Sequence, residues 1–490
     1  MDADGGVVPI AAGQPPTSGG PAAASSWTSG RLRPSGFARL AHLVFLVFVL
    51  VTSTRFIVRA LPNYLPKDWS QAHEFDGLED WLAARYYVKG ENPYGPEALG
   101  ELKRIGIGHP PTTTFWSIPL ARLDKAVAAE IFDLLSWLFL LVHLYLCARE
   151  VKFPSPLALA VLGFAWFLTT DGMTMHWHAI QISEHIALPL VVAWVFLRRG
   201  RQVPAGIALG IAATFKLFPG LLMLMLLVSR RFVAFAVAAA VYLGVAIFVT
   251  ATYGIAAWPM FFQQQQLISR AWMGSIRSAS LQGIVLRAMS PICQGNVLPL
   301  PAATVLATGL GIGLLVFTWW LSRPTLRQAR EQDHTAIDLP FALVTMLAIF
   351  LNPWIWEHYH VFLIQPAFVI LARLLAHLRG RVRGWLDEEE IGAGRLGRAA
   401  AMFLVALVAV AAVVRIYETN VYAKMTLEGM WRNHPTPWVH GQMHLMEVLN
   451  WLPWAIMIAL GMGTVAYLSP PRGEGRGRPR AAALRGPADR

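Results

Sequence analysis

The sequence predicts an all-α, polytopic membrane protein, and three observations support this. Of its 490 residues, 55% are hydrophobic and 14% are charged, whereas soluble domains carry about a quarter charged residues. The mean hydropathy is +0.47. Apolar runs recur along the chain at the length of about 17–25 residues that spans a bilayer as a helix. These runs predict about eleven to twelve membrane segments.

The predicted membrane helices alternate with short clusters of basic residues. The helices are expected near residues 38–59, 126–147, 154–170, 184–198, 232–252, 299–321, 337–351, 360–378, 398–416 and 447–467. Lys and Arg concentrate on the cytoplasmic side of membrane proteins, and with the N-terminus inside these clusters all face that side. We therefore expect a multi-pass inner (plasma) membrane protein with both termini in the cytoplasm.

The basic residues that give the net charge of +12 mostly lie in these short clusters between apolar runs. This distribution therefore indicates the lipid bilayer as a partner of this chain, and no nucleic acid.

One apolar segment, residues 203–228, is expected to break into two short helices. Basic clusters flank both of its ends, and Lys216, Pro219 and Gly220 interrupt its middle. Two helices of about a dozen residues each, meeting near the external face, satisfy both features.

The chain divides into two tails and a central membrane domain. Residues 1–37 are rich in Gly, Pro, Ala and Ser, so a disordered cytoplasmic tail is expected. Residues 38–468 form the predicted transmembrane domain, with external loops at 61–125 and 253–298. Residues 469–490 form a second disordered, basic, cytoplasmic tail. Cys147 and Cys293 fall in a predicted helix and a predicted external loop, which predicts neither a disulfide nor a zinc site.

The first external loop, 61–125, carries a cluster of carboxylates and amphipathic helical pieces. The cluster comprises Asp68, Glu74, Asp76, Glu79 and Asp80. Helical spacing of apolar residues predicts an amphipathic helix in FDGLEDWLAARYYVKG, and TTTFWSIPLARL is expected to lie on the membrane surface. Carboxylates at the mouth of a span can supply a general base at the membrane surface.

Two motifs stand in the first half of the chain. The first begins at Asp76, continues to the Pro-Tyr pair of GENPY, and is followed by HPPTTTFW, which begins at His109. The second joins Gln181 in AIQISEHIALPL to Lys216 and Pro219 in TFKLFPG.

Two further motifs follow in the second half. SASLQGIVLR contains Ser280, Leu281, Gly283 and Arg287, and NPWIWEHYH contains Pro353, Trp356 and His358. In this order the four motifs resemble glycosyltransferase family 87, within the GT-C superfamily of polyprenyl-phosphate-sugar-dependent enzymes. The resemblance covers roughly residues 40–375.

The chain departs from the family pattern at several positions. Ile180 stands where the pattern has Gly, His109 stands where Tyr is commoner, and Ser278 and Ala279 replace Asn and Gln. These departures concern the sugar and the acceptor more than the GT-C-like fold that the resemblance implies.

The resemblance implies a membrane glycosyltransferase. It would move a sugar, with mannose as the first guess, from a polyprenyl-phosphate carrier to a lipid-linked or cell-envelope glycan on the extracytoplasmic side, with inversion. Such a reaction needs a base for the acceptor hydroxyl and cations for the departing phosphate. Asp76 is the implied base, and Asp68 and Asp80 are its rivals. Asp76 and Asp80 share a helical face, and their mutual repulsion could raise one pKa.

Several residues are candidates for binding the donor phosphate or the substrate. They are Lys216, Arg287, His358, Gln181, Arg55, Arg59 and Tyr94. Four of them have a plainer alternative: Lys216 could snorkel to the headgroups, Arg55 and Arg59 could anchor the first helix at the interface, and His358 could be structural.

We expect no cofactor and no metal. His176, His178 and His185, with Asp171 and Glu184, lie at irregular spacing, which is not a metal-ligand pattern, and the resemblance implies a metal-independent enzyme. The expected partners are the polyprenyl-linked donor, a glycolipid or envelope-glycan acceptor and the bilayer.

Two other function classes remain open at this stage. A transporter or lipid-linked glycan flippase also uses broken helices such as 203–228, but it would show a repeat between halves, and none is evident. A non-catalytic scaffold of an envelope assembly would tolerate loss of Asp76.

Overall fold

The computed structural model describes residues 36–60, 76–102, 107–153, 155–170, 180–273, 278–289, 301–331, 333–353, 355–373 and 454–465. Within these ranges the chain forms helices and connecting turns and no strand, which confirms the all-α prediction. The chain separates into two compact units, Met1–Val47 and Phe48–Arg490. The boundary falls inside the first helix, so only 36–47 of the first unit are described.

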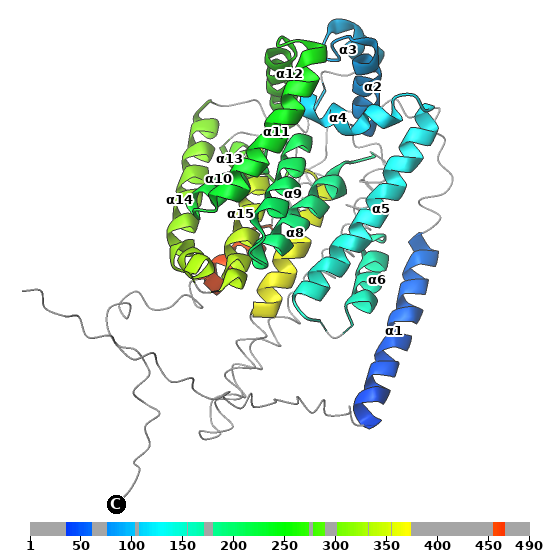
Figure 1. Ribbon diagram of the computed structural model, residues 1–490, viewed down its shortest axis with the longest axis vertical. Coiled ribbons are helices and arrows are strands. Elements are labelled where there is room, and N and C mark those ends of the chain that lie inside the picture. Colours follow the sequence, from blue (N-terminus) through cyan, green and yellow to red (C-terminus); the bar gives the residue numbers. More distant parts are fainter. Residues whose placement is uncertain are drawn as a thin grey trace, which may run out of the picture. The chain divides into compact units, whose positions relative to one another are not determined.

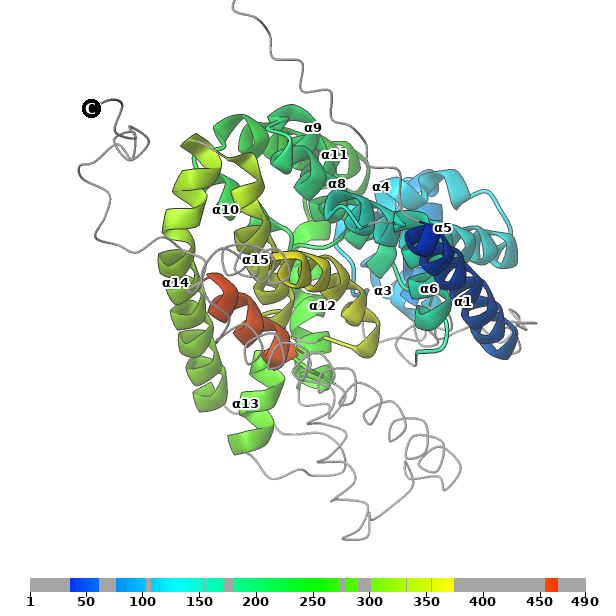
Figure 2. The same ribbon diagram turned by 90° about the horizontal axis from the view of Figure 1, so that it is seen from below.

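The helices follow the apolar runs of the sequence. The α-helices are α1 (Gly36–Ala60), α2 (Asp76–Lys89), α3 (Pro96–Leu102), α4 (Thr114–Ser117), α5 (Lys125–Glu150), α6 (Pro156–Phe167), α8 (Ser183–Arg198), α9 (Gln202–Phe215), α10 (Gly220–Val228), α11 (Phe232–Tyr253), α12 (Ala257–Trp272), α13 (Leu281–Met289), α14 (Pro301–Glu331) and α15 (Asp338–Phe350). The 3-10 helices are η3 (Pro111–Thr113), η4 (Ile118–Leu120), η5 (His334–Ile337) and η6 (Glu357–Leu363). Residues 364–373 and Trp454–Val465 are also helical (Figures 1 and 2).

Three of the described helices, α5, α11 and α14, are long and apolar enough to cross a membrane. Five shorter apolar helices accompany them: Leu46–Val58, Pro156–Phe167, Gln202–Phe215, His334–Phe350 and Trp454–Val465. Each coincides with a predicted run or with the predicted broken segment. The predicted span at 398–416 lies outside the described residues, as do both predicted tails except for Gly36 and Phe37, so the number of membrane segments stays a prediction.

The segment 203–228 is broken in the way that its sequence predicts. α9 ends at Phe215 and α10 begins at Gly220, and Lys216 between them has extended backbone angles. The two glycines of a Gly-x-x-x-Gly pattern on α9 fix the direction of the neighbouring helix. A Cβ on Gly206 would lie 2.5 Å from the carbonyl oxygen of Ala234, and one on Gly210 would lie 2.7 Å from that of Ala238.

These contacts show that α9 and α11 run parallel and touch backbone to backbone, since Gly206 meets the earlier and Gly210 the later residue of α11. Small residues permit this close approach between membrane helices. Because α9 and α11 run in the same direction, α10 between them must return the chain. α9 and α10 therefore form a helical hairpin with Lys216 at its tip.

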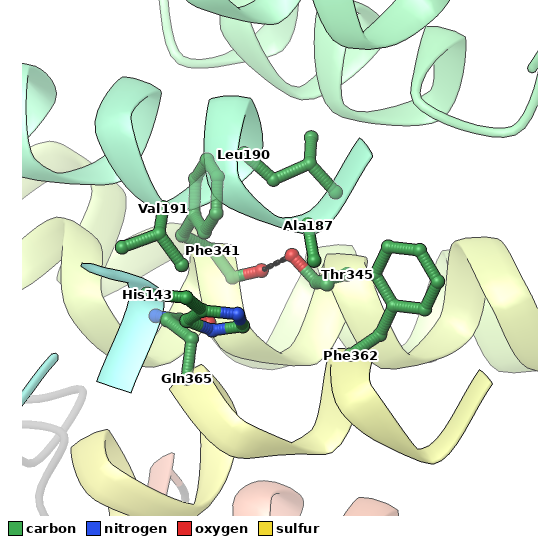
Figure 3. A pocket seen from close by; sticks show the side chains of 8 residues that line it. All are labelled: His143, Ala187, Leu190, Val191, Phe341, Thr345, Phe362 and Gln365. Atoms are coloured by element: carbon green, nitrogen blue, oxygen red, sulfur yellow. Dashed lines mark hydrogen bonds between the residues drawn. The ribbon is translucent and has the colours of Figure 1, made fainter. Parts of the chain in front are cut away.

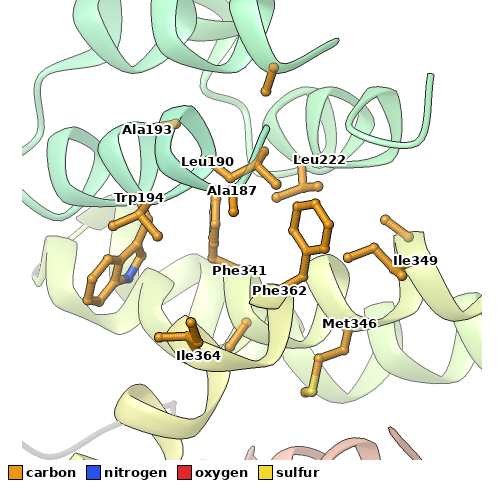
Figure 4. Close-up of a cluster of buried hydrophobic side chains, with 14 of the residues drawn as sticks. Ala187, Leu190, Ala193, Trp194, Leu222, Phe341, Met346, Ile349, Phe362 and Ile364 are labelled. Carbon is orange, nitrogen blue, oxygen red and sulfur yellow. The ribbon is translucent and has the colours of Figure 1, made fainter. Parts of the chain in front are cut away.

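The main hydrophobic core lies between α8, α10, α15 and the 357–373 segment (Figure 4). Trp194 on α8 is completely buried, as are Leu222 on α10 and Met346 on α15. Phe362 of η6 reaches the same cluster and meets the ring of Phe218 edge-on at 5.3 Å between centroids. This packing brings the NPWIWEHYH motif against the α9–α10 hairpin.

An arginine network joins the helices at one end of this bundle. Asp338 forms an ion pair with Arg198 at 2.7 Å and accepts a hydrogen bond from Arg373 at 2.8 Å, and Arg198 also pairs with Glu150 at 3.3 Å. Arg231 donates to the carbonyl oxygens of Leu197 and Ala329. Arg198, Arg231 and Arg373, which belong to three of the basic clusters expected on one side of the membrane, thus lie at the same end of the bundle. Which side of the membrane this end faces stays a prediction.

The first-loop helices gather at the opposite end, where α5 begins and α11 ends. α2, α3, α4 and α12 lie together there, at the top of Figure 1. TTTFWSIPLARL begins in this region, and its expected position on the membrane surface stays a prediction. Pro111–Thr114 are buried, because Thr112 and Thr113 donate their hydroxyls to carbonyl groups at the end of α9.

One predicted helix boundary also needs correction. The run expected at 299–321 continues as α14 to Glu331 and includes Pro324. The Arg, Gln and Glu residues after 321 are good helix formers, and the apolar Leu326 and Ala329 between them are buried against the core. The apolar pattern marked only the lipid-facing part of this helix.

Candidate functional site

Two carboxylates of α2 hold the segment that precedes η3. Asp80 is 1% exposed, and its carboxylate lies 2.9 Å from Nδ1 of His109, which is 4% exposed. One position earlier, Glu79 accepts a hydrogen bond of 2.8 Å from the backbone N–H of Gly108. A buried carboxylate is stable only with partners of this kind. Asp80 and Glu79 therefore fix residues 107–110 to α2.

A second set of contacts holds the same segment from the other side. The Tyr94 hydroxyl donates to the carbonyl oxygen of His109 at 2.7 Å. Gln264 of α12 accepts from the Ile107 N–H at 2.9 Å and donates to the Tyr94 carbonyl at 2.8 Å. Burial, together with the nearby carboxylate of Asp80, raises the pKa of the Tyr94 phenol well above its usual value, so it stays a donor. Tyr94 and Gln264 thus support the His109 segment.

The first turn of α2 packs directly on the loop before α8. A Cβ on Gly77 would lie 2.5 Å from Cγ2 of Ile180 and 2.6 Å from its carbonyl oxygen. Ile180 has φ +50°, a left-handed conformation that favours glycine. The family pattern has Gly at this position, and the backbone here keeps the conformation that glycine would allow. Gln181 follows directly and is buried.

The HPPTTTFW segment reaches from α2 to the tip of the α9–α10 hairpin. Thr112 and Thr113 bond the carbonyl oxygens of Thr214 and Phe215 at 2.7 and 2.8 Å. Trp116 donates its indole N–H to the Thr214 hydroxyl at 2.7 Å and stacks on Phe215 at 5.5 Å. The first loop therefore contacts the residues immediately before Lys216.

Lys216 points inward to the fourth motif. Its Nζ donates to the hydroxyl of Tyr359 at 2.6 Å and lies 4.9 Å from the centroid of that ring. Tyr359 is 1% exposed. A lysine that snorkels would direct its ammonium group away from the core to the headgroups, and Lys216 does not. An ammonium has three N–H donors, so this contact uses one of them.

The third and fourth motifs are joined by main-chain and hydroxyl contacts. Ser280 donates to the carbonyl of Pro353 at 2.8 Å, and the N–H of Ala279 bonds the carbonyl of Ile355 at 3.0 Å. Arg287 of α13 donates to the carbonyl of Ser278 at 2.9 Å and is 7% exposed. The four sequence motifs therefore form one connected region of the molecule: the first touches the second, and the fourth touches both the second and the third.

Of the remaining predicted site residues, some have a position in the structure and others lie outside the described residues. Asp68 is outside the described residues. Asp76 is the first residue of α2, but its side chain is not described, and neither is that of Arg59 on α1. Arg55 is exposed. His358 is 5% exposed and packs against Tyr359, with ring centroids 4.7 Å apart.

No group of three or more His, Cys, Asp and Glu side chains with a metal-binding arrangement occurs in the described ranges. Of the five residues weighed as metal ligands, Asp171, His176 and His178 lie outside those ranges. Glu184 and His185 are buried on α8.

Sequence reasoning missed the residues that support this region. Gln264 belongs to a run of four glutamines on an otherwise apolar helix, and that unexplained polarity was the signal. Thr112, Thr113 and Tyr359 lie inside motifs but carry no charge, so nothing in the sequence distinguished them from their neighbours.

Comparison with known proteins agrees with the motif order. A family model for glycosyltransferase family 87 matches residues 108–353, about half of the chain. No curated protein and no solved structure matches the chain. The matched range contains Gln181, Lys216 and Arg287, whereas the first-loop carboxylates and His358 lie outside it. Because the family model matches half of the chain, and because the chain has apolar helices long enough to cross a membrane, the chain belongs to glycosyltransferase family 87 and is a membrane glycosyltransferase.

Proposed function

We propose that the protein transfers a hexosyl or pentosyl group, mannose as the first candidate, from a polyprenyl-phosphate carrier to a lipid-linked or cell-envelope glycan. Transfer occurs at the extracytoplasmic face with inversion. One observation carries the proposal. The first turn of α2, which begins at Asp76, packs through Gly77 on Ile180 and so adjoins Gln181. A first-loop carboxylate is thereby attached to the part of the chain that matches the family.

In this proposal Asp76 is the general base. The acceptor oxygen bonds to the anomeric carbon while the bond from that carbon to the phosphate oxygen breaks, and Asp76 takes the acceptor proton. The first turn of a helix favours a negative charge, so Asp76 is suited to be ionised before the reaction. Asp80 is the weaker candidate, since its carboxylate is already bound to His109.

Lys216 is the leading candidate for the departing phosphate. It stands at the tip of the hairpin, is directed inward, and is held by Tyr359. A cation held in place stabilises the charge that develops on a leaving phosphate. Arg287 and His358 join the same region through the contacts of the third and fourth motifs. Gln181, Arg59 and Tyr94 remain candidates for substrate contacts, although the Tyr94 hydroxyl already bonds His109.

The test is transfer of labelled sugar in membranes that contain the wild-type protein. Polyprenyl-phosphate mannose, other polyprenyl-phosphate sugars and nucleotide sugars are supplied in parallel. We expect transfer from a polyprenyl-phosphate donor only, and a loss of about 100-fold or more in Lys216→Met, the size of effect that follows removal of one charge-stabilising donor.

Other outcomes point elsewhere. Transfer from a nucleotide sugar alone would overturn the proposed donor but leave the family assignment intact. Movement of a lipid-linked glycan across the membrane, without transfer from any donor, would favour the flippase alternative. Equal transfer by Lys216→Met and wild type would remove Lys216 from the site.

A further inference from the structure

Four polar side chains meet inside the helix bundle, and one of them, Glu184, belongs to the second motif, AIQISEHIALPL. His143 of α5, Glu184 of α8, Thr345 of α15 and Gln365 of the 364–373 helix are each at most 3% exposed. Nδ1 of His143 lies 3.8 Å from a carboxylate oxygen of Glu184. Within the described residues, hydrogen-bond partners are missing for both ring nitrogens of His143, both carboxylate oxygens of Glu184 and both amide atoms of Gln365.

A small cavity adjoins three of these side chains. His143, Thr345 and Gln365 line it together with the apolar residues Ala187, Leu190, Val191, Phe341 and Phe362 (Figure 3). The space open to the centre of a water molecule is ≈ 10 Å³, about the least that one water needs.

One water molecule suits the chemistry of this cavity. A buried polar atom without a partner costs about 1–3 kcal/mol, and a buried water typically makes about three hydrogen bonds. The Thr345 hydroxyl already donates to the carbonyl of Phe341 at 2.9 Å, which leaves its oxygen to accept. His143, Thr345 and Gln365 thus offer the three polar partners that such a water requires.

The charge state of Glu184 follows from its surroundings. No Lys or Arg of the described chain pairs with it, and its nearest titratable partner is His143. The neighbouring His185 is enclosed by the rings of Phe132 and Phe139. On the same helices, Asp338 is paired with Arg198 and Arg373, and Glu150 with Arg198 and Arg199. An ionised Glu184 would therefore be an uncompensated buried charge, which a protein interior strongly disfavours.

We propose that His143, Glu184, Thr345 and Gln365 form an intramembrane site that binds one water and one proton. The proton resides on Glu184 as a carboxylic acid beside a neutral His143, and the water joins His143 to Thr345 and Gln365. Ionisable groups inside a membrane domain are rare and functional more often than elsewhere. None of the four side chains is a candidate for the base or for phosphate binding, although Glu184 follows the candidate Gln181 by three residues.

The test is infrared spectroscopy of the full-length protein carrying ¹³C-carboxyl glutamate. At neutral pH the wild type should show the carbonyl band of a protonated glutamic acid, shifted in D₂O, and the band should be missing from Glu184→Gln. Glu130→Gln, an exposed position on α5, is the control and should keep it. His143→Gln should shift the band without removing it.

Absence of the band from the folded wild-type protein would overturn the proposal, even if Glu184→Gln failed to fold. So would a melting temperature that rises with Na⁺ in the wild type but not in Glu184→Gln, because the site would then bind a metal cation in place of a proton. Persistence of the band in folded Glu184→Gln would show that another glutamate carries the proton, and this would also overturn the proposal.

Discussion

Gly77 and Ile180 touch so closely that a single methyl group on Gly77 would lie 2.5 Å from the Ile180 side chain. This contact joins the first turn of α2 to the loop before α8. It depends on two local properties: the missing side chain at position 77, and the left-handed backbone of Ile180 at φ +50°. The first turn of α2, which begins at Asp76, thereby becomes part of a packed region.

Replacing Gly77 by Ala should displace this turn and lower transfer. Contacts below 3.0 Å force a shift, and here both side-chain and carbonyl atoms of Ile180 are in the way. A misplacement near 1 Å can cost about 100-fold in rate. Transfer and melting temperature are measured together, with Gly100→Ala, where a Cβ meets nothing within 4 Å, as the control.

The double variant Gly77→Ala/Ile180→Gly should recover part of the lost transfer. Glycine at position 180 removes the Cγ2 and Cβ contacts and suits the positive φ, but the carbonyl contact at 2.6 Å remains. No recovery at all, at equal expression, would contradict this account of the contact.

Replacing Asp80 should lower the melting temperature. Asp80→Ala should melt below Asp80→Asn, and Asp80→Asn below the wild type. Asn keeps a hydrogen bond to His109 but loses its charge assistance, at a cost of about 1 kcal/mol, whereas Ala leaves buried His109 without this partner, at about 1–3 kcal/mol more. The melting temperatures of the purified proteins check this, with exposed Asp124→Asn as control. An Asp80→Asn protein with unchanged stability and abolished transfer would make Asp80 the base.

Gln264→Leu should destabilise the packing of residues 107–110 against α12 by about 2–6 kcal/mol. It leaves the Ile107 N–H and the Tyr94 carbonyl without their partner, and each such buried group costs about 1–3 kcal/mol. Limited proteolysis within residues 94–111 and chemical denaturation measure the effect. The exposed neighbour Gln263→Leu is the matched control, and equal behaviour of the two variants would refute the role assigned to Gln264.

The stability of the wild type should fall more steeply in alkali than that of Tyr94→Phe. The folded pKa of Tyr94 is raised above its unfolded value of 10.0, so its contribution is complete below pH 10.0 and is lost as the pH rises beyond that value. Tyr94→Phe loses the bond to His109 and is less stable at neutral pH, but it lacks this alkaline loss. Melting temperatures from pH 8 to about pH 11 compare the two slopes; identical slopes would contradict the burial of a neutral phenol.

The helical architecture was predictable because membrane spans need a fixed length of apolar sequence. α5, α11 and α14 follow from run length alone, and the break at Lys216 follows from its polar and Pro-Gly residues. The extension of α14 beyond residue 321 was not predictable, because most of it is polar and only a few residues, Ser322, Leu326 and Ala329, are buried.

The candidate site was predictable in its motifs but not in its contacts. Charge and motif order pointed to Asp76, Lys216 and Arg287. Nothing in the sequence indicates that Lys216 would meet Tyr359, because that pairing depends on how the hairpin packs against η6. The anchoring of Asp80 by His109 likewise depends on the path of the loop between them.

The central claim is that Asp76 acts as the base while Asp80 anchors the loop. Single-turnover sugar transfer and melting temperature, measured on Asp76→Asn, Asp80→Asn and Asp68→Asn, test it most directly. The account predicts that Asp76→Asn loses at least about 100-fold in rate, within the range of general-base catalysis, at wild-type stability. Wild-type transfer by Asp76→Asn, with loss in Asp68→Asn instead, would contradict it.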